Sequence, residues 1–348
     1  MKTGKSIIMG HRNGRRMERN GFMAVNTAYL CEEERQGIRV LEYRSLDSLA
    51  AVPEQAGGRP VTALAPYLFS AHKNYNDGEH PGAFWISESG QRLPWEEAGE
   101  LPVVKGDVLE ELRLPSVLKH VGNYGLYNCS RLKKLELFST TLDWGPGVFT
   151  GCQGVTDLTV HVDESQKSCL KEILAELRQT LTVTYDGEEK ALLIFPEFFE
   201  EAVENTPARI LMTNTHGCGQ RYRNAFVQTR FQFQEYDSLF PHVQVQEPEE
   251  LVTELALGRI MHPYHLSEEF KCRYMEYLKE HKTAAACQAV RKENMNCLTW
   301  LIEHVSYEKE DLKIVIETAN RRGNTPAVSM LMNRAEKQGA VKRRRFAL

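Results

Sequence analysis

The residues best equipped for chemistry lie in a short glycine-rich stretch, residues 216–224, with the sequence HGCGQRYRN. His216 and Cys218 are residue types that bind metal ions, and glycine-rich backbone beside Arg221 and Arg223 is typical of phosphate-binding loops. The stretch lacks the third glycine of a dinucleotide-binding loop, and no clear strand leads directly into it. Two hypotheses follow: an enzyme active site or metal site here, or a structural turn whose arginines pair with acidic neighbours. Because short motifs often match by accident, we expect the turn.

A second group of potential metal ligands lies further along the chain: His262, His265, Glu269 and Cys272. Pro263 stands inside the histidine pair, and the Ser-Glu-Glu sequence at residues 267–269 is typical of a helix start. Short ligand spacings recur by chance. We therefore expect a helix here and no metal ion.

The spacing of Ser168 and Lys171 is that of the S-x-x-K motif of penicillin-recognising enzymes. Leu170 between them lies on the apolar stripe of a predicted helix, no S-D-N sequence follows, and the only K-T-G lies upstream of the motif. No nucleophile, base and orienting group stand out together, although such sets meet in space and a sequence can hide one. We expect no catalytic residues and no cofactor, so the chain is not predicted to be an enzyme.

Length and composition are those of a soluble protein built from two or three units. The chain has 348 residues and a net charge of -4, which gives no general attraction to nucleic acid or acidic membranes. It has no apolar run of roughly 18 residues, so no membrane span is expected. Its eight cysteines include no C-x-x-C pair, and the basic N-terminus lacks the apolar core of a secretion signal. We therefore expect reduced thiols in a cytoplasmic protein.

Two segments, residues 118–137 and 141–160, match one another when shifted by 23 residues. The matched positions are Val121/Trp144, Gly122/Gly145, Leu126/Phe149, Cys129/Cys152, Leu132/Val155, Leu135/Leu158 and Leu137/Val160. The L-x-x-L-x-L end of each segment alternates with period two, as a strand with one buried face does. The glycines allow a tight turn, and the cysteine is a small buried group between turns. One such unit cannot bury its own apolar side, so neighbouring units must stack.

This pattern is similar to I-x-x-I-G-x-x-A-F-x-x-C-x-x-L-x-x-I-x-I-P, the repeat of BspA-like bacterial leucine-rich repeat proteins. The resemblance covers about residues 38–162, with partial copies on either side of an insertion at residues 73–108. Gly125 and Val148 replace the usual small alanine, and Trp144 replaces an aliphatic residue. The family implies a curved parallel-sheet solenoid that binds proteins or surface ligands, and it offers no catalytic residues to carry over.

The segment after the repeats, residues 163–245, is predicted to be a small α+β connector. An apolar stripe predicts an amphipathic helix within residues 165–179. Residues 181–185 and 191–195 are predicted to be two strands around an Asp-Gly turn, which is a hairpin signal. A further helix is expected at residues 197–204.

Residues 246–338 are predicted to be helical throughout and repeat with a shift of 30 residues. The coincident positions are Ala289/Ala319, Asn294/Asn324, Leu298/Val328 and Leu301/Leu331. The order of a small residue, a polar turn and an apolar helix resembles the second half of an ankyrin repeat, which implies protein binding. A plain helical bundle is the alternative, because a helical period alone does not distinguish the two. Residues 1–37 are predicted to be a basic, partly disordered leader followed by a first strand, and residues 339–348 a solvated basic tail.

These patterns predict an α/β-type repeat protein: a short leucine-rich-repeat solenoid, an α+β connector and C-terminal ankyrin-like helical repeats. The predicted function is a non-catalytic scaffold that binds a protein partner, and the alternative is an enzyme or metal-binding protein with its site at His216–Arg223. The 23-residue period places the exposed positions of successive strands side by side. The candidate binding residues form two rows, one of Arg113, Glu136 and Thr159 and one of Glu111, Lys134 and Asp157.

Overall fold

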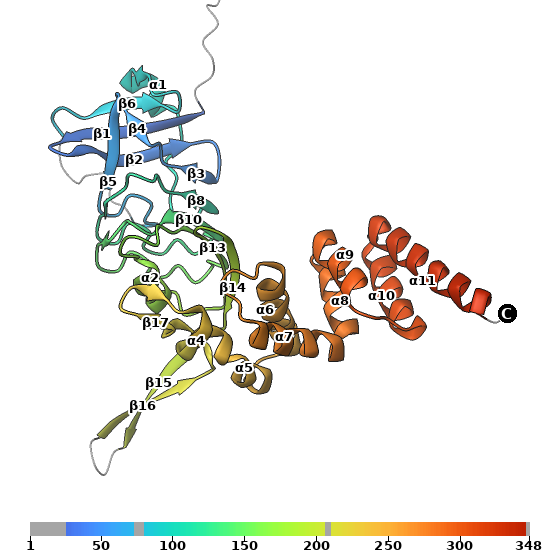
Figure 1. Cartoon of the computed structure of the whole chain (residues 1–348). Coiled ribbons are helices and arrows are strands. Elements are labelled where there is room, and N and C mark those ends of the chain that lie inside the picture. Colours follow the sequence, from blue (N-terminus) through green and yellow to red (C-terminus); the bar gives the residue numbers. More distant parts are fainter. Residues whose placement is uncertain (1–25, 73–79, 206–209, 346–348) are drawn as a thin grey trace, which may run out of the picture.

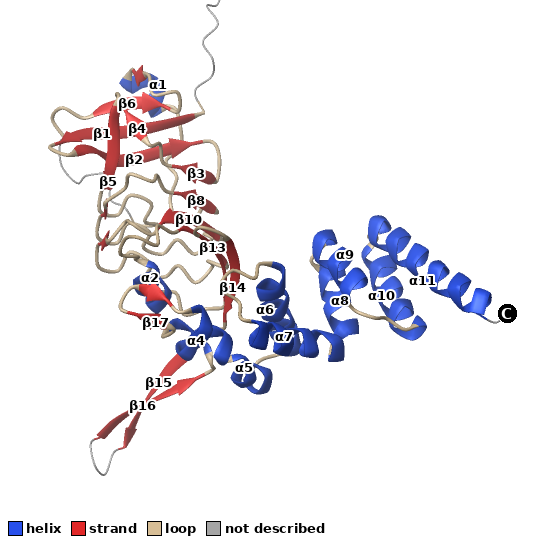
Figure 2. Ribbon diagram, in the orientation of Figure 1, coloured by secondary structure: helices blue, strands red, loops and turns tan. Residues whose placement is uncertain are grey.

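The computed structural model describes residues 26–72, 80–205 and 210–345. Within them the chain forms a β-solenoid followed by a C-terminal region made of helices (Figures 1 and 2). This is the predicted fold class. Most of the predicted leader, residues 1–25, lies outside the described residues, as do residues 73–79 of the insertion and residues 346–348 of the tail.

Six strands form the sheet that runs along the solenoid. They are β3 (Leu49–Ala51), β8 (Glu111–Arg113), β10 (Lys134–Phe138), β12 (Asp157–His161), β13 (Leu181–Asp186) and β14 (Lys190–Phe195). Strands β3 to β13 are parallel, and β14 returns antiparallel to β13. Leu112, Leu135 and Leu158 pair side by side, so the predicted 23-residue shift is the step from one strand to the next. Alternate side chains point into the core, as the L-x-L pattern requires.

A second sheet joins the N-terminal strands to the repeats. Its parallel strands are β2 (Gly37–Ser45), β5 (Arg59–Leu64), β9 (His120–Val121) and β11 (Asp143–Trp144). Val121 pairs with Trp144, again 23 residues away. Side chains from both sheets, among them Val40, Leu64 and Leu135, belong to one buried apolar core.

Cysteine thiols link successive turns of the solenoid by hydrogen bonds. The Sγ of Cys129 donates to the carbonyl oxygen of Phe69 at 3.3 Å, and the Sγ of Cys152 donates to that of Leu126 at 3.0 Å. Contact with Cys152 and burial raise the pKa of the Cys129 thiol, which therefore stays protonated and able to donate. The repeat cysteine is thus a hydrogen-bond donor as well as the small buried group that the sequence predicted.

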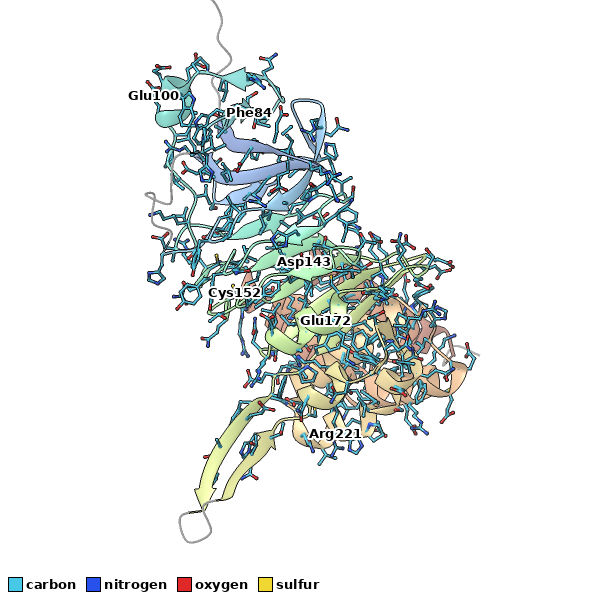
Figure 3. All side chains as sticks on the ribbon, turned by 90° about the vertical axis from the view of Figure 1, so that its left-hand side faces the viewer. Phe84, Glu100, Asp143, Cys152, Glu172 and Arg221 are labelled. Atoms are coloured by element: carbon cyan, nitrogen blue, oxygen red, sulfur yellow. The ribbon has the colours of Figure 1, made fainter. Side chains whose placement is uncertain are left out.

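The first end of the solenoid is covered by the N-terminal strands and by the insertion. The covering elements are β1 (Thr27–Glu34), β4 (Gln55–Ala56), β6 (Phe84–Ser87), β7 (Arg92–Leu93) and α1 (Trp95–Gly99). β1 pairs antiparallel with both β2 and β6, so the insertion adds strands to the second sheet. Trp85 packs edge-on against Trp95 with ring centroids 5.9 Å apart. Phe84 and Glu100 mark this folded insertion at one end of the molecule in Figure 3.

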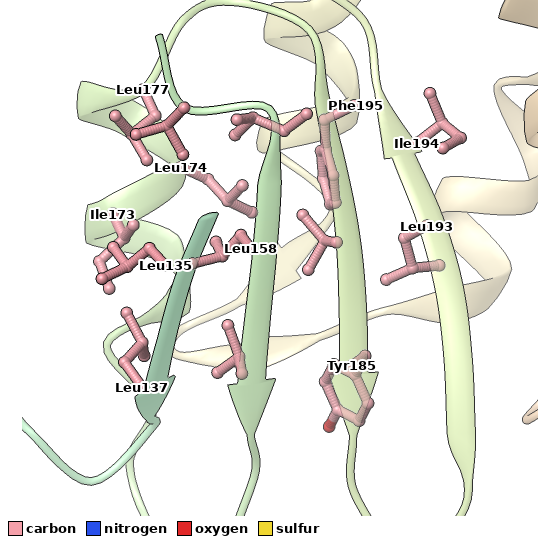
Figure 4. Close-up of a cluster of buried hydrophobic side chains, with 14 of the residues drawn as sticks. Leu135, Leu137, Leu158, Ile173, Leu174, Leu177, Tyr185, Leu193, Ile194 and Phe195 are labelled. Atoms are coloured by element: carbon pink, nitrogen blue, oxygen red, sulfur yellow. The ribbon is translucent and has the colours of Figure 1, made fainter. Parts of the chain in front are cut away.

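After the repeats, the predicted amphipathic helix and the predicted hairpin are both present. α2 (Leu170–Glu176) buries Leu170, Ile173 and Leu174 in the core (Figure 4). β13 and β14 form the hairpin, and β13 also pairs in parallel with β12. The hairpin therefore extends the solenoid sheet past residue 162, where we expected the repeats to end.

The expected helix at residues 197–204 is wrong. Residues Phe199–Asn205 form strand β15, which pairs antiparallel with β16 (Ile210–His216). Glutamate and alanine favour a helix locally, but Phe199 and Val203 remain exposed and no apolar stripe is buried. Pairing with β16 satisfies the backbone instead. The hairpin of β15 and β16 extends away from the body of the molecule (Figure 1).

The last strand of the long sheet, β14, is covered by the elements that follow. These are α3 (Gly219–Arg223), β17 (Phe226–Val227), β18 (Arg230–Phe231), α4 (Phe233–Ser238), α5 (Phe240–Gln246) and α6 (Glu249–Met261). The hydroxyl of Tyr236 in α4 accepts from the backbone N–H of Ile194 and donates to its carbonyl oxygen, both at 2.8 Å. α6 lies against the same strand (Figure 1). An edge that would otherwise be open to pairing with another chain is thereby closed.

A fully buried ion pair holds this junction together. The Nε and Nη2 atoms of Arg259 in α6 bond the two carboxylate oxygens of Asp237 in α4, at 2.8 and 2.9 Å. The hydroxyl of Tyr274 donates to the same carboxylate at 2.8 Å, and Arg259 also donates to the carbonyl oxygen of Tyr264. Because the bidentate geometry and these extra bonds satisfy both charges, the pair is tolerated without water.

The C-terminal helices are α7 (Glu268–Glu280), α8 (Lys282–Arg291), α9 (Met295–His304), α10 (Lys309–Arg322) and α11 (Thr325–Arg345). Successive helices contact one another in pairs, α6 with α7, α8 with α9 and α10 with α11. Asn294 and Asn324 each cap the following helix by accepting a backbone N–H three residues later, at 3.0 and 3.1 Å. The preceding residues, Glu293 and Gly323, both have positive φ, 55° and 69°. The same turn geometry therefore occurs twice, 30 residues apart. The described residues between α9 and α10 contain no β-hairpin finger. The ankyrin resemblance stays a prediction.

We expect removal of one partner of the Asp237–Arg259 pair to destabilise the junction strongly. In Asp237→Leu the charge of Arg259 stays buried without its carboxylate, so the free energy of unfolding should fall by about 3–5 kcal/mol. The double variant Asp237→Leu/Arg259→Met leaves no buried charge and should recover most of that loss. Urea denaturation followed by circular dichroism measures both. A double variant as unstable as the single one would contradict this account.

Candidate interaction surface

The outward face of the six-stranded sheet brings the six predicted binding residues together. Arg113, Glu136 and Thr159 pair side by side across β8, β10 and β12, and form one row as the period predicted. Glu111, Lys134 and Asp157 form the second row, one pleat away. The structure extends the first row through Ala51, Thr184 and Leu192, and the second through Leu49, Thr182 and Ile194.

A third row of the same face was missed by the sequence analysis. It consists of Phe138, His161, Asp186 and Lys190, which pair in that order across β10, β12, β13 and β14. Phe138 and His161 lie 23 residues apart and two positions after Glu136 and Thr159, so the repeat period alone contained the signal for them. Asp186 could not be assigned to this row from the period, because its place depends on β13 being a further strand of the sheet.

An ion-pair network crosses the face from strand to strand. The Nε of Arg113 lies 2.8 Å from Glu136, and the second carboxylate oxygen of Glu136 lies 2.9 Å from the Nε2 of His161. The Nδ1 of His161 lies 2.8 Å from Asp186, whose other oxygen is 3.5 Å from the ammonium of Lys190. Both bonds of His161 form together only when both ring nitrogens carry a proton.

The electrostatics of the face follow from these contacts. Burial favours the neutral form of Glu136, but the hydrogen bonds from His161 and Arg113 outweigh it and lower the pKa of this carboxyl. Lys134 and Glu111 form a separate pair at 2.6 Å, and this contact raises the pKa of Lys134. The face therefore presents fixed, alternating charges and no large patch of one sign.

The glycine-rich stretch at residues 216–224 leads from strand β16 into the short helix α3, so the expectation that no strand precedes it is wrong. His216 ends β16, stacks on Phe199 with ring centroids 4.7 Å apart and lies 3.2 Å from a carboxylate oxygen of Glu201. The thiol of Cys218 is buried and lies 3.1 Å from Glu247. Burial and this carboxylate raise the pKa of Cys218, so the thiol stays protonated at neutral pH.

The two arginines of this turn have different roles. Arg223 is buried, and its guanidinium donates to five backbone carbonyl oxygens, those of Leu174, Leu177, Gln179, Pro196 and Gly219. Burial lowers its pKa to about 10, so the group stays charged at neutral pH. Arg221 is exposed and contacts His242. The expected acidic partners are therefore replaced by carbonyl oxygens, because Arg223 closes the ends of α2 and β14.

Across the part of the chain that the structure describes, no group of three histidine, cysteine, aspartate or glutamate side chains is placed to hold a metal ion. In the second candidate group, Ser267 caps α7 by accepting from the N–H of Phe270 at 3.4 Å, which is the predicted helix start. The ring of His265 packs at a tilt against that of Tyr264 instead, with ring centroids 4.1 Å apart.

Comparisons with known proteins do not assign a family. No family and no curated protein matches the sequence. Among solved structures, the chain is similar to a leucine-rich cell surface protein from Faecalibacterium prausnitzii, with 14% identity, a TM-score of 0.23, and coverage of 40% of this chain and 34% of the other. It is also similar to a leucine-rich repeat protein from T. pallidum, with 17% identity, a TM-score of 0.17, and coverage of 46% and 80%. The chain thus spans about a third of the first protein's length. None of the described helices is long and apolar enough to cross a membrane.

The network on the sheet face should make stability depend on pH. Because folding lowers the pKa of Glu136, its contribution is present above the ordinary glutamate pKa of 4.5 and is lost as the pH falls below it. Glu136→Gln should cost roughly 0.5–1 kcal/mol at pH 7, since the group is only partly buried. Urea titrations of both proteins between pH 3 and pH 7 test this. The difference should shrink toward acid pH, and a constant difference would contradict it.

Metal analysis separates the two hypotheses for the glycine-rich turn. We expect the purified protein to hold no stoichiometric zinc, because His216 and Cys218 contact different carboxylates, Glu201 and Glu247. His216→Ala and Cys218→Ser should leave the metal content, measured by plasma mass spectrometry, unchanged. Stoichiometric zinc that is lost in either variant would establish the metal site.

Proposed function

We propose that this protein is a non-catalytic scaffold that binds a protein partner through the outward face of its six-stranded sheet. One observation carries the proposal: three rows of polar and charged side chains lie in register across consecutive strands on a face that is only partly covered. A rigid sheet holds these groups in place before a partner arrives, which lowers the entropy cost of binding. A regular array of exposed charges on repeats is suited to recognising an extended surface.

The charge pattern favours specificity over general attraction. Arg113 with Glu136, and Lys134 with Glu111, alternate in sign along the face, so a partner must match the pattern and not merely the sign. The residues that suggested an alternative catalytic or metal site are engaged in structural contacts, above all Arg223. The cysteines are free thiols, and all but Cys272 are buried, which is compatible with the proposed cytoplasmic location.

Charge reversal on the face tests the proposal. Arg113→Glu, Glu136→Lys and Lys134→Glu should each weaken partner binding by roughly tenfold, because each sets a like charge against the partner's complementary group. The partner is first captured from native lysate with the full chain, and its affinity for each variant is then measured by surface plasmon resonance.

Two controls separate binding from stability. The swap Glu111→Lys/Lys134→Glu keeps the ion pair but inverts its direction, so it should preserve the melting temperature while still weakening binding. Glu172→Lys changes an exposed residue of α2, which lies across the core from the sheet (Figure 4), and should leave affinity unchanged. Unchanged affinity in all the face variants, with unchanged melting, would place the binding site elsewhere.

A further inference from the structure

A pocket of about 330 Å³ lies where the turn after β12 meets β18 and the start of α4. Part of its lining is apolar and comes from Val162, Leu170, Tyr185, Phe231 and Phe233. Polar and charged side chains make up the rest. The volume is at the lower end of the roughly 300–1,000 Å³ of small-molecule sites, so the pocket suits a group of side-chain size.

One carboxylate in the lining of this pocket, that of the half-buried Glu164, is held in a fixed orientation. Its Oε1 accepts from the hydroxyl of Tyr264 at 2.7 Å and from that of Tyr185 at 3.2 Å. Burial and the neighbouring Glu164 raise the pKa of both hydroxyls, which therefore stay protonated and able to donate. The two donors occupy Oε1, so only Oε2 remains for a further contact.

The Oε2 of Glu164 is open. It makes no hydrogen bond, and Glu164 makes no ion pair, within the part of the chain that the structure describes. Nor is Oε2 one of the buried atoms there that lack a partner, so it is reachable from solvent. The pocket therefore contains a carboxylate with one free, accessible oxygen and no counter-charge.

The other acidic and basic side chains of the pocket, Asp163 and Arg230, balance one another. Both are exposed. Hydrogen bonds from Ser165 and Gln166 lower the pKa of Asp163, which is therefore ionised at neutral pH. With histidine counted as neutral, the net charge of the pocket is thus the single negative charge of Glu164. A ligand with one positive charge would balance it.

One free oxygen favours an ammonium group over a guanidinium. Arginine binds a carboxylate best through two parallel N–H bonds, which need both oxygens, whereas a lysine ammonium is a point charge that one oxygen can meet. The methylene chain of lysine also packs well on apolar surface, which Val162 and Phe231 supply here. Aromatic rings add a favourable interaction with a cation. The chemistry of the lining therefore matches a lysine side chain.

The pocket borders the proposed binding face. Val162 directly follows His161 of the third row, and its backbone N–H donates to the carbonyl oxygen of Asp186, a member of the same row, at 2.8 Å. Glu164 comes two residues after Val162. A partner that covers the third row therefore has side chains within reach of the pocket.

We propose that this pocket binds a lysine side chain of the protein partner, whose ammonium group contacts the Oε2 of Glu164. The tyrosine hydroxyls hold the carboxylate in place before the partner arrives, which lowers the entropy cost of the contact. This inference rests on the proposed function, because it takes the lysine from the protein that the sheet face binds.

Capped amino acids test the pocket without the partner. The full chain is labelled with ¹³C at its valine methyl groups, and Val162 in the pocket reports binding by NMR, with the exposed Val245 as the internal reference. Acetyl-lysine amide, capped at its α-nitrogen, should shift Val162 with saturation and leave Val245 unchanged. Acetyl-norleucine amide has a similar side chain without the ammonium group and should bind roughly tenfold more weakly. Acetyl-arginine amide should also bind more weakly than the lysine amide.

Glu164→Gln removes the charge but keeps the size of the side chain and an oxygen that the two tyrosines can bond. It should lower the affinity for the lysine amide to that of the norleucine amide. Glu188→Gln is the matched control, because Glu188 is an exposed carboxylate near Tyr264 that is not part of the lining, and it should leave the affinity unchanged. If Glu164→Gln does not fold, the comparison of the probes in the unchanged protein decides.

Three results of the probe experiments would overturn the inference. They are no shift of Val162 up to the solubility limit of the lysine amide, no preference for lysine over norleucine, and an equal loss of affinity in Glu164→Gln and Glu188→Gln. The last result would assign binding to the general negative charge of the surface.

The captured partner completes the test. Glu164→Gln should weaken its binding roughly tenfold with an unchanged melting temperature. Unchanged partner affinity, with the lysine amide still bound by the original protein, would show that the pocket takes a free amine and would overturn the assignment to the partner. The face variants fail or succeed separately. If they leave partner affinity unchanged while Glu164→Gln weakens it, the proposed face alone is wrong, and if they weaken it while no lysine amide binds, the pocket alone is wrong.

Discussion

The structure depends on one constraint: a turn of the solenoid cannot bury its own apolar side. Each of the repeats places leucine or valine side chains on the inner face of a strand, and only the next turn covers them. Stacking buries these apolar side chains inside the array, but it leaves those at both ends uncovered. The N-terminal strands with the insertion cover the first end, and α3, α4 and α6 cover the last strand. Much of the chain outside the repeats is therefore explained by the need to close the array.

The closure of the last strand uses buried polar groups as well as apolar packing. Arg223 ties the carbonyl oxygens at the ends of α2 and β14 to one guanidinium, and Tyr236 occupies the free edge of β14. The Asp237–Arg259 pair then joins α4 to α6, from which the helical pairs continue. Such groups tolerate few alternative geometries, because each donor must meet its acceptor without help from water. They hold α6, from which the helical region continues, against the last strand of the sheet.

The proposed function rests on this placement more than on any single reactive residue. The histidine, cysteine and buried arginine of the glycine-rich stretch contact carbonyl oxygens and carboxylates of the fold. The residues left facing outward are those of the strand rows, held by a sheet and paired with one another. A surface of this kind is suited to recognition.

The sequence by itself determined the repeats, because a period of 23 or 30 residues is imposed by stacking and is visible in the spacing of leucine, cysteine and asparagine. It therefore predicted the solenoid, the helical pairs and two rows of the face, Arg113 and Lys134 among them. Only the tertiary structure decided that β13 joins the same sheet, which brings Asp186 to His161, because that pairing breaks the 23-residue period. It also decided that Phe199–Asn205 is a strand and that Arg223 is buried, since partners distant in the chain set both. The spacing of residue types along the sequence shows contacts that repeat, whereas contacts that are made once are known only from the three-dimensional structure.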